Sequence, residues 1–567
     1  MHVLAAQTKN RRTLIFRSLI AIATTALLVS GTAAQAAPSP KAGAACSKAK
    51  AAVTVKSGKA VVKLICTKLK GHLIWVAAPS PIKKPVVVTA KLGGNFRVGV
   101  VALPTGKGNP FVGIGTPSIY TMSAIYDSLV TVNEVGDLVP SLATKWTQTS
   151  DTSWTFTLRD GVSFSNGEKF DANSVVATIN YLTQDPVGAK TVVAAEINTI
   201  SSVSGSGNTV TINTKTADSV LPRKLSVVWM VAPKAWETLG AAGYALNPVG
   251  TGPFAVSTWG ATALTLQANK ASWRSPKVDS MQILQIPDPT ARIQAMQSGQ
   301  IDLAVQVGPD EVSQIDPKKF QVVYDSFPQV MSLAYITTKG DSPLLNKQVR
   351  LALNYAVNRD AIVKNLLGGK GTAANQGSTK AVFGYDANLP KYPYDPTQAK
   401  ALLAQAGYPT GFTISADVTV GSFPADADIY QAVAHDLKRI GVTLLLRQVP
   451  FSEWLAEYST NGWTGQAFGL SWNSNTLDAG RAIGLFSCSG PGKFFCNQEM
   501  TPVLTEINSA TTESARKAAL LKAAQINYYN PPALYIVGQV DINVLGSMVK
   551  GFKNVNRYFE YQKITVR

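Results

Sequence analysis

Few side chains that commonly do chemistry are present in this sequence, and their spacing matches no catalytic or metal-binding motif. The 567 residues include three histidines, His2, His72 and His435. His435 falls off the apolar stripe of a helix expected over residues 427–440, which is typical of a solvated side chain. No His-Glu-x-x-His, Gly-x-Ser-x-Gly or Gly-x-x-x-x-Gly-Lys-Ser/Thr motif occurs. We therefore predict a protein that is not an enzyme and that uses no cofactor and no metal.

The four cysteines form two pairs that are local in the sequence. Their positions make Cys46–Cys66 and Cys488–Cys496 the simplest disulfide connectivity. A zinc site is the rival interpretation, but neither pair has the Cys-x-x-Cys spacing of zinc sites. A disulfide that closes a loop of about 20 residues contributes on the order of 3 kcal/mol in the chain-entropy model. The cysteines therefore indicate two disulfides and an oxidising compartment.

The first 36 residues have the pattern of an export signal. Four basic residues precede an apolar run at 19–29 that is too short to span a bilayer, and small residues follow. We place the cleavage after Ala36. Arg11 and Arg12 also resemble a twin-arginine signal, so both export routes stay open. Because no later long apolar stretch occurs, we expect an exported and soluble mature protein.

The net charge of +19 is concentrated near the N-terminus. Residues 1–36 hold four basic and no acidic residues, and residues 37–91 hold eleven lysines and no acidic residue, which leaves +4 for residues 92–567. The main body is therefore nearly neutral. The sequence shows no basic face interleaved with aromatic residues, so we do not expect a nucleic-acid partner. The lysine-rich segment 37–91 instead favours an anionic cell-wall polymer or lipid head groups as its partner.

The elements that must position any site fall into a small module, a linker and one large α/β region. Residues 37–77 hold three short strand patterns that a Cys46–Cys66 disulfide would hold together. These patterns lie at 52–55, 61–65 and 73–76. Residues 78–91 are rich in Pro and Lys and predict an extended linker. From residue 92 to residue 567, strand patterns alternate with capped-helix patterns, which predicts an α/β fold.

Six segments of the large region occur in the order typical of one known family. They are Tyr-Asp-Ser-Leu-Val at 126–130, Leu-Val-Pro-Ser-Leu-Ala-Thr-Lys-Trp at 138–146, Thr-Phe-Thr-Leu-Arg-Asp-Gly-Val-Ser-Phe at 155–164, Asn-Pro-Val-Gly-Thr-Gly-Pro-Phe at 247–254, Val-Arg-Leu-Ala-Leu-Asn-Tyr-Ala-Val-Asn-Arg at 349–359, and 394–408. Together they resemble the family 5 extracellular solute-binding proteins of ABC importers, the peptide/nickel and dipeptide/oligopeptide type. The resemblance covers about residues 92–567. It implies a bilobed, periplasmic-binding-protein-like α/β fold of the large, three-subdomain type.

The resemblance implies two lobes that are joined by a hinge and close around a solute. Lobe 1 would hold about residues 92–342 and 541–567, and lobe 2 about 343–540. The chain would cross between the lobes near 340–346 and 538–545. The implied protein is an extracellular, monomeric binding component without catalysis, which captures a peptide-like solute and delivers it to the permease subunits of an ABC importer.

The resemblance also points to candidate solute contacts. Peptide-binding relatives typically have Trp-x-x-Asp-Tyr-Pro-Asp-Pro where this chain has Trp-Asn-Ser-Asn-Thr-Leu-Asp-Ala, and their first Asp pairs with the ligand's α-ammonium. Trp472 and Asp478 match this motif, whereas Asn475 replaces the first Asp. An Asn cannot neutralise a buried ammonium. Tyr335, in a strand before the expected crossing, and Phe111, in the loop after the first strand, are the other expected contacts.

The departure at Asn475 leaves the solute class open. Either Asp478 or another carboxylate pairs with the amine of a peptide, or the solute is a sugar, an opine or a peptide-derived metabolite without a free amine at this place. A wall-associated sensory or interaction protein that keeps the fold without feeding a transporter is the alternative function. Both interpretations predict an exported protein at the cell surface or wall.

Overall fold

The computed structural model describes residues 41, 44–57, 60–69, 72–77, 93–421, 423–472, 474–490 and 494–566. The predicted signal peptide (1–36) and linker (78–91) lie outside the described residues. The chain divides after Val88 into two compact units, each of which is described by itself. No helix in the described ranges is both long and apolar enough to cross a bilayer.

The N-terminal unit holds a small antiparallel sheet with the order β1-β2-β3. Its strands are β1 (Ala52–Ser57), β2 (Ala60–Leu69) and β3 (His72–Ala77). The Cys46–Cys66 disulfide ties the segment before β1 to the middle of β2, where Cys66 lies opposite Trp75. Leu64 and Cys66 of β2 are buried. Both this disulfide and the predicted three strands are confirmed, and so small a core depends on such a covalent link.

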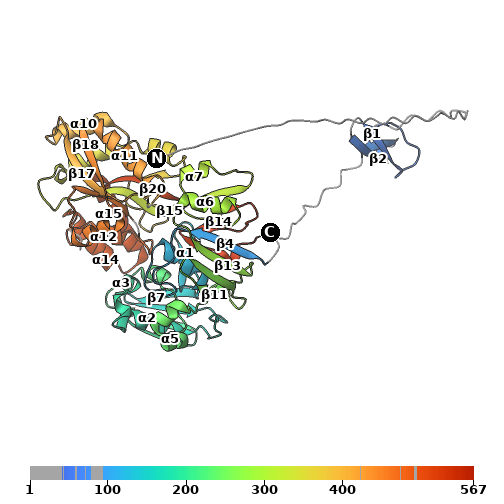
Figure 1. Ribbon diagram of the computed structural model, residues 1–567, viewed down its shortest axis with the longest axis horizontal. Coiled ribbons are helices and arrows are strands. Elements are labelled where there is room, and N and C mark those ends of the chain that lie inside the picture. The colour runs from blue at the N-terminus through green and yellow to red at the C-terminus, as the bar shows by residue number, and fades with distance from the viewer. Residues whose placement is uncertain are drawn as a thin grey trace, which may run out of the picture. The chain divides into compact units, whose positions relative to one another are not determined.

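The second unit is built on one long mixed sheet with the order β11-β12-β13-β4-β14-β20-β15-β19-β17-β18. Two long strands at its centre, β15 (Phe320–Tyr335) and β20 (Ala533–Gly546), pair with each other along most of their length. One lobe is built on each side of this pair, as Figure 1 shows. The predicted α/β class and bilobed architecture are confirmed.

Lobe 1 contains residues 93–326 and 540–566 and has its own hydrophobic core, which includes Phe96, Val98 and Phe156. A smaller four-stranded sheet with the order β7-β8-β10-β9 packs against α2 and forms an additional domain in this lobe. The elements of lobe 1 are β4 (Asn95–Val100), α1 (Thr116–Ile125), β5 (Val130–Val132), β6 (Leu138–Pro140), β7 (Ala143–Ser150), β8 (Ser153–Leu158), α2 (Ala172–Gln184), α3 (Val192–Glu196), β9 (Ile200–Ser206), β10 (Thr209–Thr214), α4 (Leu221–Lys224), α5 (Pro233–Leu246), β11 (Phe254–Trp259), β12 (Ala263–Ala268), β13 (Ser280–Gln285), α6 (Pro289–Gln297), β14 (Leu303–Ala304), α7 (Pro309–Ser313), β21 (Asn554–Val555) and β22 (Tyr558–Phe559).

Lobe 2 contains residues 330–538 and has separate cores on the two faces of its part of the sheet. Its helix α11 buries Ile429, Val433 and Leu437 on one stripe and leads into β18, as the sequence predicts. The elements are α8 (Lys347–Ala356), α9 (Arg359–Leu366), β16 (Thr372–Ala373), α10 (Pro396–Gln405), β17 (Phe412–Val418), α11 (Asp426–Lys438), β18 (Val442–Gln448), α12 (Phe451–Thr460), β19 (Ala467–Trp472), α13 (Gly480–Leu485), α14 (Met500–Ser509) and α15 (Glu513–Tyr529). The Cys488–Cys496 disulfide, also confirmed, closes the loop between α13 and α14.

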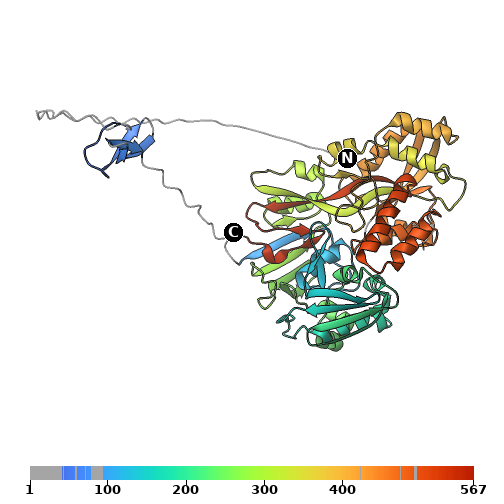
Figure 2. The same cartoon turned by 180° about the vertical axis from the view of Figure 1, so that it is seen from behind.

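The two lobes are connected through β15 and β20. Residues 320–326 of β15 lie opposite 540–546 of β20 in lobe 1, and residues 330–334 lie opposite 533–538 in lobe 2. The register shifts between Ser326 and Val330, so the strands cross there and at 538–540. The first crossing therefore precedes the expected 340–346, because residues 330–335 already pair with β19 of lobe 2. Seen from behind in Figure 2, the red β20 and the yellow-green β15 pass together from one lobe to the other.

Candidate ligand-binding site

Trp472 lies at the end of β19, where this strand pairs with β15 just beyond the crossing. Its indole packs against the rings of Phe486 (centroids 4.5 Å apart) and Tyr535 (5.6 Å), and its Nε1 donates to Ser332 Oγ at 3.0 Å. A cavity of about 20 Å³ between Trp472, Gly377 and Ser378 borders the indole. That volume holds about one water molecule. The indole is therefore a core side chain that also forms part of a small cavity wall.

Asp478 and Asn475, in the turn after β19, differ in their partners. Asp478 is buried and paired in a bidentate manner with Arg516, with Oδ2 to Nε at 2.9 Å and Oδ1 to Nη2 at 2.8 Å. Its Oδ1 also accepts from the backbone N–H of Gly480. Asn475 is partly exposed, and its side chain makes no hydrogen bond within the described ranges. The fold thus engages Asp478 internally and leaves the Asn475 amide available.

Tyr335 and Phe111 lie in different lobes. Tyr335 ends β15 in the core of lobe 2, and its buried hydroxyl has no hydrogen-bond partner among the described residues. Burial raises the pKa of this hydroxyl, an effect that Arg350 and Arg359 oppose. The Phe111 ring is fully buried in lobe 1 against Tyr181 and Trp236. The ring contacts of Phe111 thus join the first loop of lobe 1 to the additional domain of the same lobe.

The two lobes also touch at the side of the additional domain. We call this set of contacts the seam; it consists of the contacts that Arg223, Gly136, Gln148 and Glu196 make with lobe 2. The buried guanidinium of Arg223 lies 5.0 Å from the ring centre of Phe383 and 3.9 Å from Glu513. Three more contacts complete it: Gln148 to the Thr511 carbonyl at 2.9 Å, an ion pair of Glu196 with Arg481, and close backbone approach of Gly136 to Ala381. The helix α14 accordingly lies beside α3 in Figure 1.

A buried polar cluster at the crossing strands was not predicted from the sequence. Asp325 of β15 and Asp541 of β20 lie directly opposite each other. Asp541 accepts from the Tyr120 hydroxyl at 2.8 Å, and Asp325 accepts from Asn543 at 3.1 Å. Burial, followed by repulsion from Asp541, raises the pKa of Asp325 to about 6, and burial also raises that of Asp541. The alternation of Gln539, Asp541 and Asn543 within an otherwise apolar strand is the signal that could have revealed this cluster.

Asp325 gives a prediction for the pH dependence of stability. Because its folded-state pKa of about 6 exceeds the unfolded value, the folded protein binds the extra proton, and stability falls as pH rises from about 4 to 6. We expect Asp325→Asn to raise the free energy of unfolding at pH 7.5 by about 1–2 kcal/mol and to flatten that decline. Urea denaturation at pH 4.5, 6 and 7.5 measures both effects. Asp341→Asn, at an exposed position, is the matched control, and a destabilised Asp325→Asn protein at pH 7.5 would contradict the argument.

The arrangement offers binding groups rather than a reactive set. Among the described residues, no three His, Cys, Asp or Glu side chains gather into a possible metal site. The side chain of His435 is exposed and does not belong to the buried stripe of α11. What the crossing region supplies is aromatic surface, amides and buried carboxylates. These groups suit recognition of a polar solute.

Comparisons with known proteins point in one direction. The sequence model of the family described as "Bacterial extracellular solute-binding proteins, family 5 Middle" matches residues 137–494. Heme-binding protein A of Haemophilus influenzae is 27% identical over 543 residues, which cover 86% of this chain and 96% of that protein. Glutathione-binding protein GsiB of Shigella dysenteriae is 26% identical over 461 residues, covering 78% of this chain and 89% of that protein.

A solved structure extends the likeness to the fold. The periplasmic binding protein DppA from Helicobacter pylori, in complex with the peptide STSA, is 22% identical and superposes with a TM-score of 0.69, covering 84% of this chain and 98% of that one. At this identity the likeness concerns the fold alone.

Proposed function

The chain belongs to family 5 of the bacterial extracellular solute-binding proteins, and from this premise we propose that it captures a small peptide-like solute between its lobes and delivers it to the permease of an ABC importer. The observation that carries the proposal is the pair of crossing strands. Two lobes with separate cores are joined by β15 and β20 and touch at the seam, which is the geometry that hinge closure requires. We further propose that it acts as a monomer and catalyses no reaction.

Trp472 and Asn475 are our proposed solute contacts. The small cavity beside Trp472 is lined by residues of lobe 2 alone, and the Asn475 amide, which makes no hydrogen bond within the described ranges, offers one donor pair and one acceptor. Asp478, held by Arg516, acts as a positioning residue that fixes this turn. Tyr335 and Phe111 remain predicted contacts, each buried in one lobe. A neutral group of the solute therefore suits this corner better than a free ammonium.

Mass spectrometry of gently purified protein tests the proposed function. We expect a small solute in one-to-one stoichiometry, and we expect its re-addition to raise the melting temperature with the logarithm of its concentration. The panel for the thermal measurement contains dipeptides, N-acetylated dipeptides, glutathione, opines and sugars. A protein that carries no solute and shows no shift with any of these at millimolar concentration would sink the proposal and favour the sensory or interaction alternative.

The N-terminal module favours attachment to an anionic wall polymer as an accompanying role. Lys41, Lys48, Lys50, Lys63 and Lys68 are exposed, and residues 37–91 contain no acidic residue to pair with them. Cations on a surface without carboxylates attract polyanions in a salt-dependent manner. Deletion of residues 37–91 is expected to release the protein from the cell surface, and exchange of these five lysines for serine should release it in part. Retention of the deleted protein would refute the role.

A further inference from the structure

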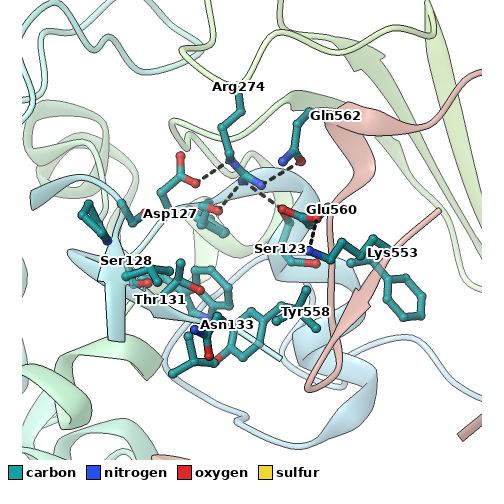
Figure 3. A pocket seen from close by; sticks show the side chains of 18 of the residues that line it. Ser123, Asp127, Ser128, Thr131, Asn133, Arg274, Lys553, Tyr558, Glu560 and Gln562 are labelled. Carbon is teal, nitrogen blue, oxygen red and sulfur yellow. Dashed lines mark hydrogen bonds and ion pairs between the residues drawn. The ribbon is translucent and has the colours of Figure 1, made fainter. Parts of the chain in front are cut away.

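A second cavity of about 370 Å³ lies wholly within lobe 1, and it shares no residue with the Trp472 cavity. Segments far apart in the sequence build its walls: the end of α1, the β5–β6 hairpin, single residues near 229 and 273, and the C-terminal residues 553–562. Figure 3 shows Asp127, Thr131 and Tyr558 among the side chains arranged around it. Its volume lies within the range of small-molecule sites.

Aromatic side chains form a large part of the wall. The lining includes Tyr126, Trp229, Trp273, Tyr558 and Phe559. The rings of Trp229 and Tyr558 lie 5.8 Å apart and inclined by 53°, so they meet as two sides of a corner. The indole of Trp273 is fixed by its Nε1 bond to Asp127 at 2.9 Å. Tyr126, Trp229 and Phe559 are almost fully buried, whereas the rings of Trp273 and Tyr558 are partly exposed and offer flat apolar surface without an ordering cost when a ligand binds.

The charged groups of the cavity already have partners. Asp127 pairs with Arg274 at 2.7 Å, and its other oxygen accepts from Thr251 and Trp273. At the rim, Lys553 pairs with Glu134 and lies 3.7 Å from Glu560. Figure 3 shows Arg274 beside Asp127 and Lys553 beside Glu560. Because these charges are neutralised within the wall, a ligand with its own net charge gains little and would compete with an existing pair.

Several uncharged polar groups of the wall have no partner. Within the described ranges, the hydroxyls of Thr131 and Ser141 make no hydrogen bond, and the amide nitrogen of Gln562 donates none. The same wall also carries the aromatic rings. Such a surface matches a molecule that has flat carbon–hydrogen faces and a rim of hydroxyls.

We infer that this cavity is a binding site for a neutral saccharide of one or two rings, separate from the proposed solute site between the lobes. The partly exposed rings of Trp273 and Tyr558 stack on a sugar face, and the hydroxyls of Thr131 and Ser141 with the Gln562 amide bond the sugar hydroxyls. The internally paired charges disfavour ionic ligands, and the polar groups disfavour purely apolar ones.

The test titrates the full chain with glucose, N-acetylglucosamine, maltose, cellobiose and trehalose, using calorimetry and saturation-transfer NMR. Thr131→Val keeps the shape of the side chain in β5 and removes its hydroxyl, and we expect it to weaken binding of the preferred sugar about three- to tenfold. Thr147→Val, at an exposed place in β7 outside the cavity, is the matched control and should bind normally. Asn475→Asp, at the proposed solute site, should also leave sugar binding unchanged.

Two results would overturn the inference. One is that no sugar of the panel binds at about 50 mM, a concentration that detects even very weak association. The other is that Asn475→Asp alters sugar binding while Thr131→Val does not. That second result would make the sugar the solute captured between the lobes, so the proposed function would stand while the second site would be lost.

Discussion

Replacement of Arg516 by methionine is expected to lower the free energy of unfolding by about 3–5 kcal/mol, because it leaves the Asp478 carboxylate buried without its counter-charge. Both side chains are largely buried, with 12% and 6% of their surfaces exposed, and two short bonds of 2.8 and 2.9 Å join them. Arg516 also donates to the Ile507 carbonyl and so joins α15 to α14. Chemical denaturation at neutral pH measures the loss.

A matched control lies on the same helix. Lys522 of α15 pairs with Glu506 of α14 at 2.7 Å, but both side chains are about half exposed. We expect Lys522→Met to change the stability by less than about 1 kcal/mol, since exposed ion pairs contribute little. In the double variant Asp478→Asn with Arg516→Met, most of the lost stability should return, because no buried charge remains. Equal losses in the Arg516 and Lys522 variants would contradict this account.

Local patterns in the sequence predicted many elements correctly. The stripe of Ile429, Val433 and Leu437 predicted α11, and both cysteine pairs predicted their disulfides. These features depend on residues that are near one another in the chain, so period and spacing are enough to reveal them. The bilobed fold came from the order of six family segments, which carry information about the whole chain rather than about one element.

Features that depend on distant pairing could not be predicted in the same way. The first crossing lies inside the continuous strand β15. Only the pairing of β15 with β20 and β19 shows where one lobe ends and the other begins. Asp325 and Asp541 are far apart in sequence and meet through strand register. The cavity of lobe 1 is likewise assembled from four distant segments. Local spacing in the sequence cannot predict these long-range contacts, because they form only when the chain folds.

The solute site itself shows how a motif match and a structural role can diverge. Asp478 matches the second Asp of the peptide-binding motif, yet its oxygens are occupied by Arg516 and Gly480. It therefore cannot take over the role of the missing first Asp without breaking a buried pair, which costs several kcal/mol. In our proposal Asn475 is the residue that would meet a ligand amine, and its side chain is uncharged. The chemistry at position 475 should thus decide which solutes are accepted.

Asn475→Asp is expected to strengthen binding of a free-amine dipeptide such as Ala-Phe about ten- to a hundredfold, because a charge-assisted hydrogen bond to an ammonium is worth about 1.5–3 kcal/mol. The side chain is partly exposed, so the added charge can be solvated and the fold should keep its stability. Calorimetric titration of both proteins measures the gain, and N-acetyl-Ala-Phe, which lacks the ammonium, should show none. The gain should shrink above about pH 8, where the peptide amine loses its proton. Unchanged affinity for Ala-Phe would mean that position 475 does not meet the amine, and the solute would then have to be oriented by groups other than the turn after β19.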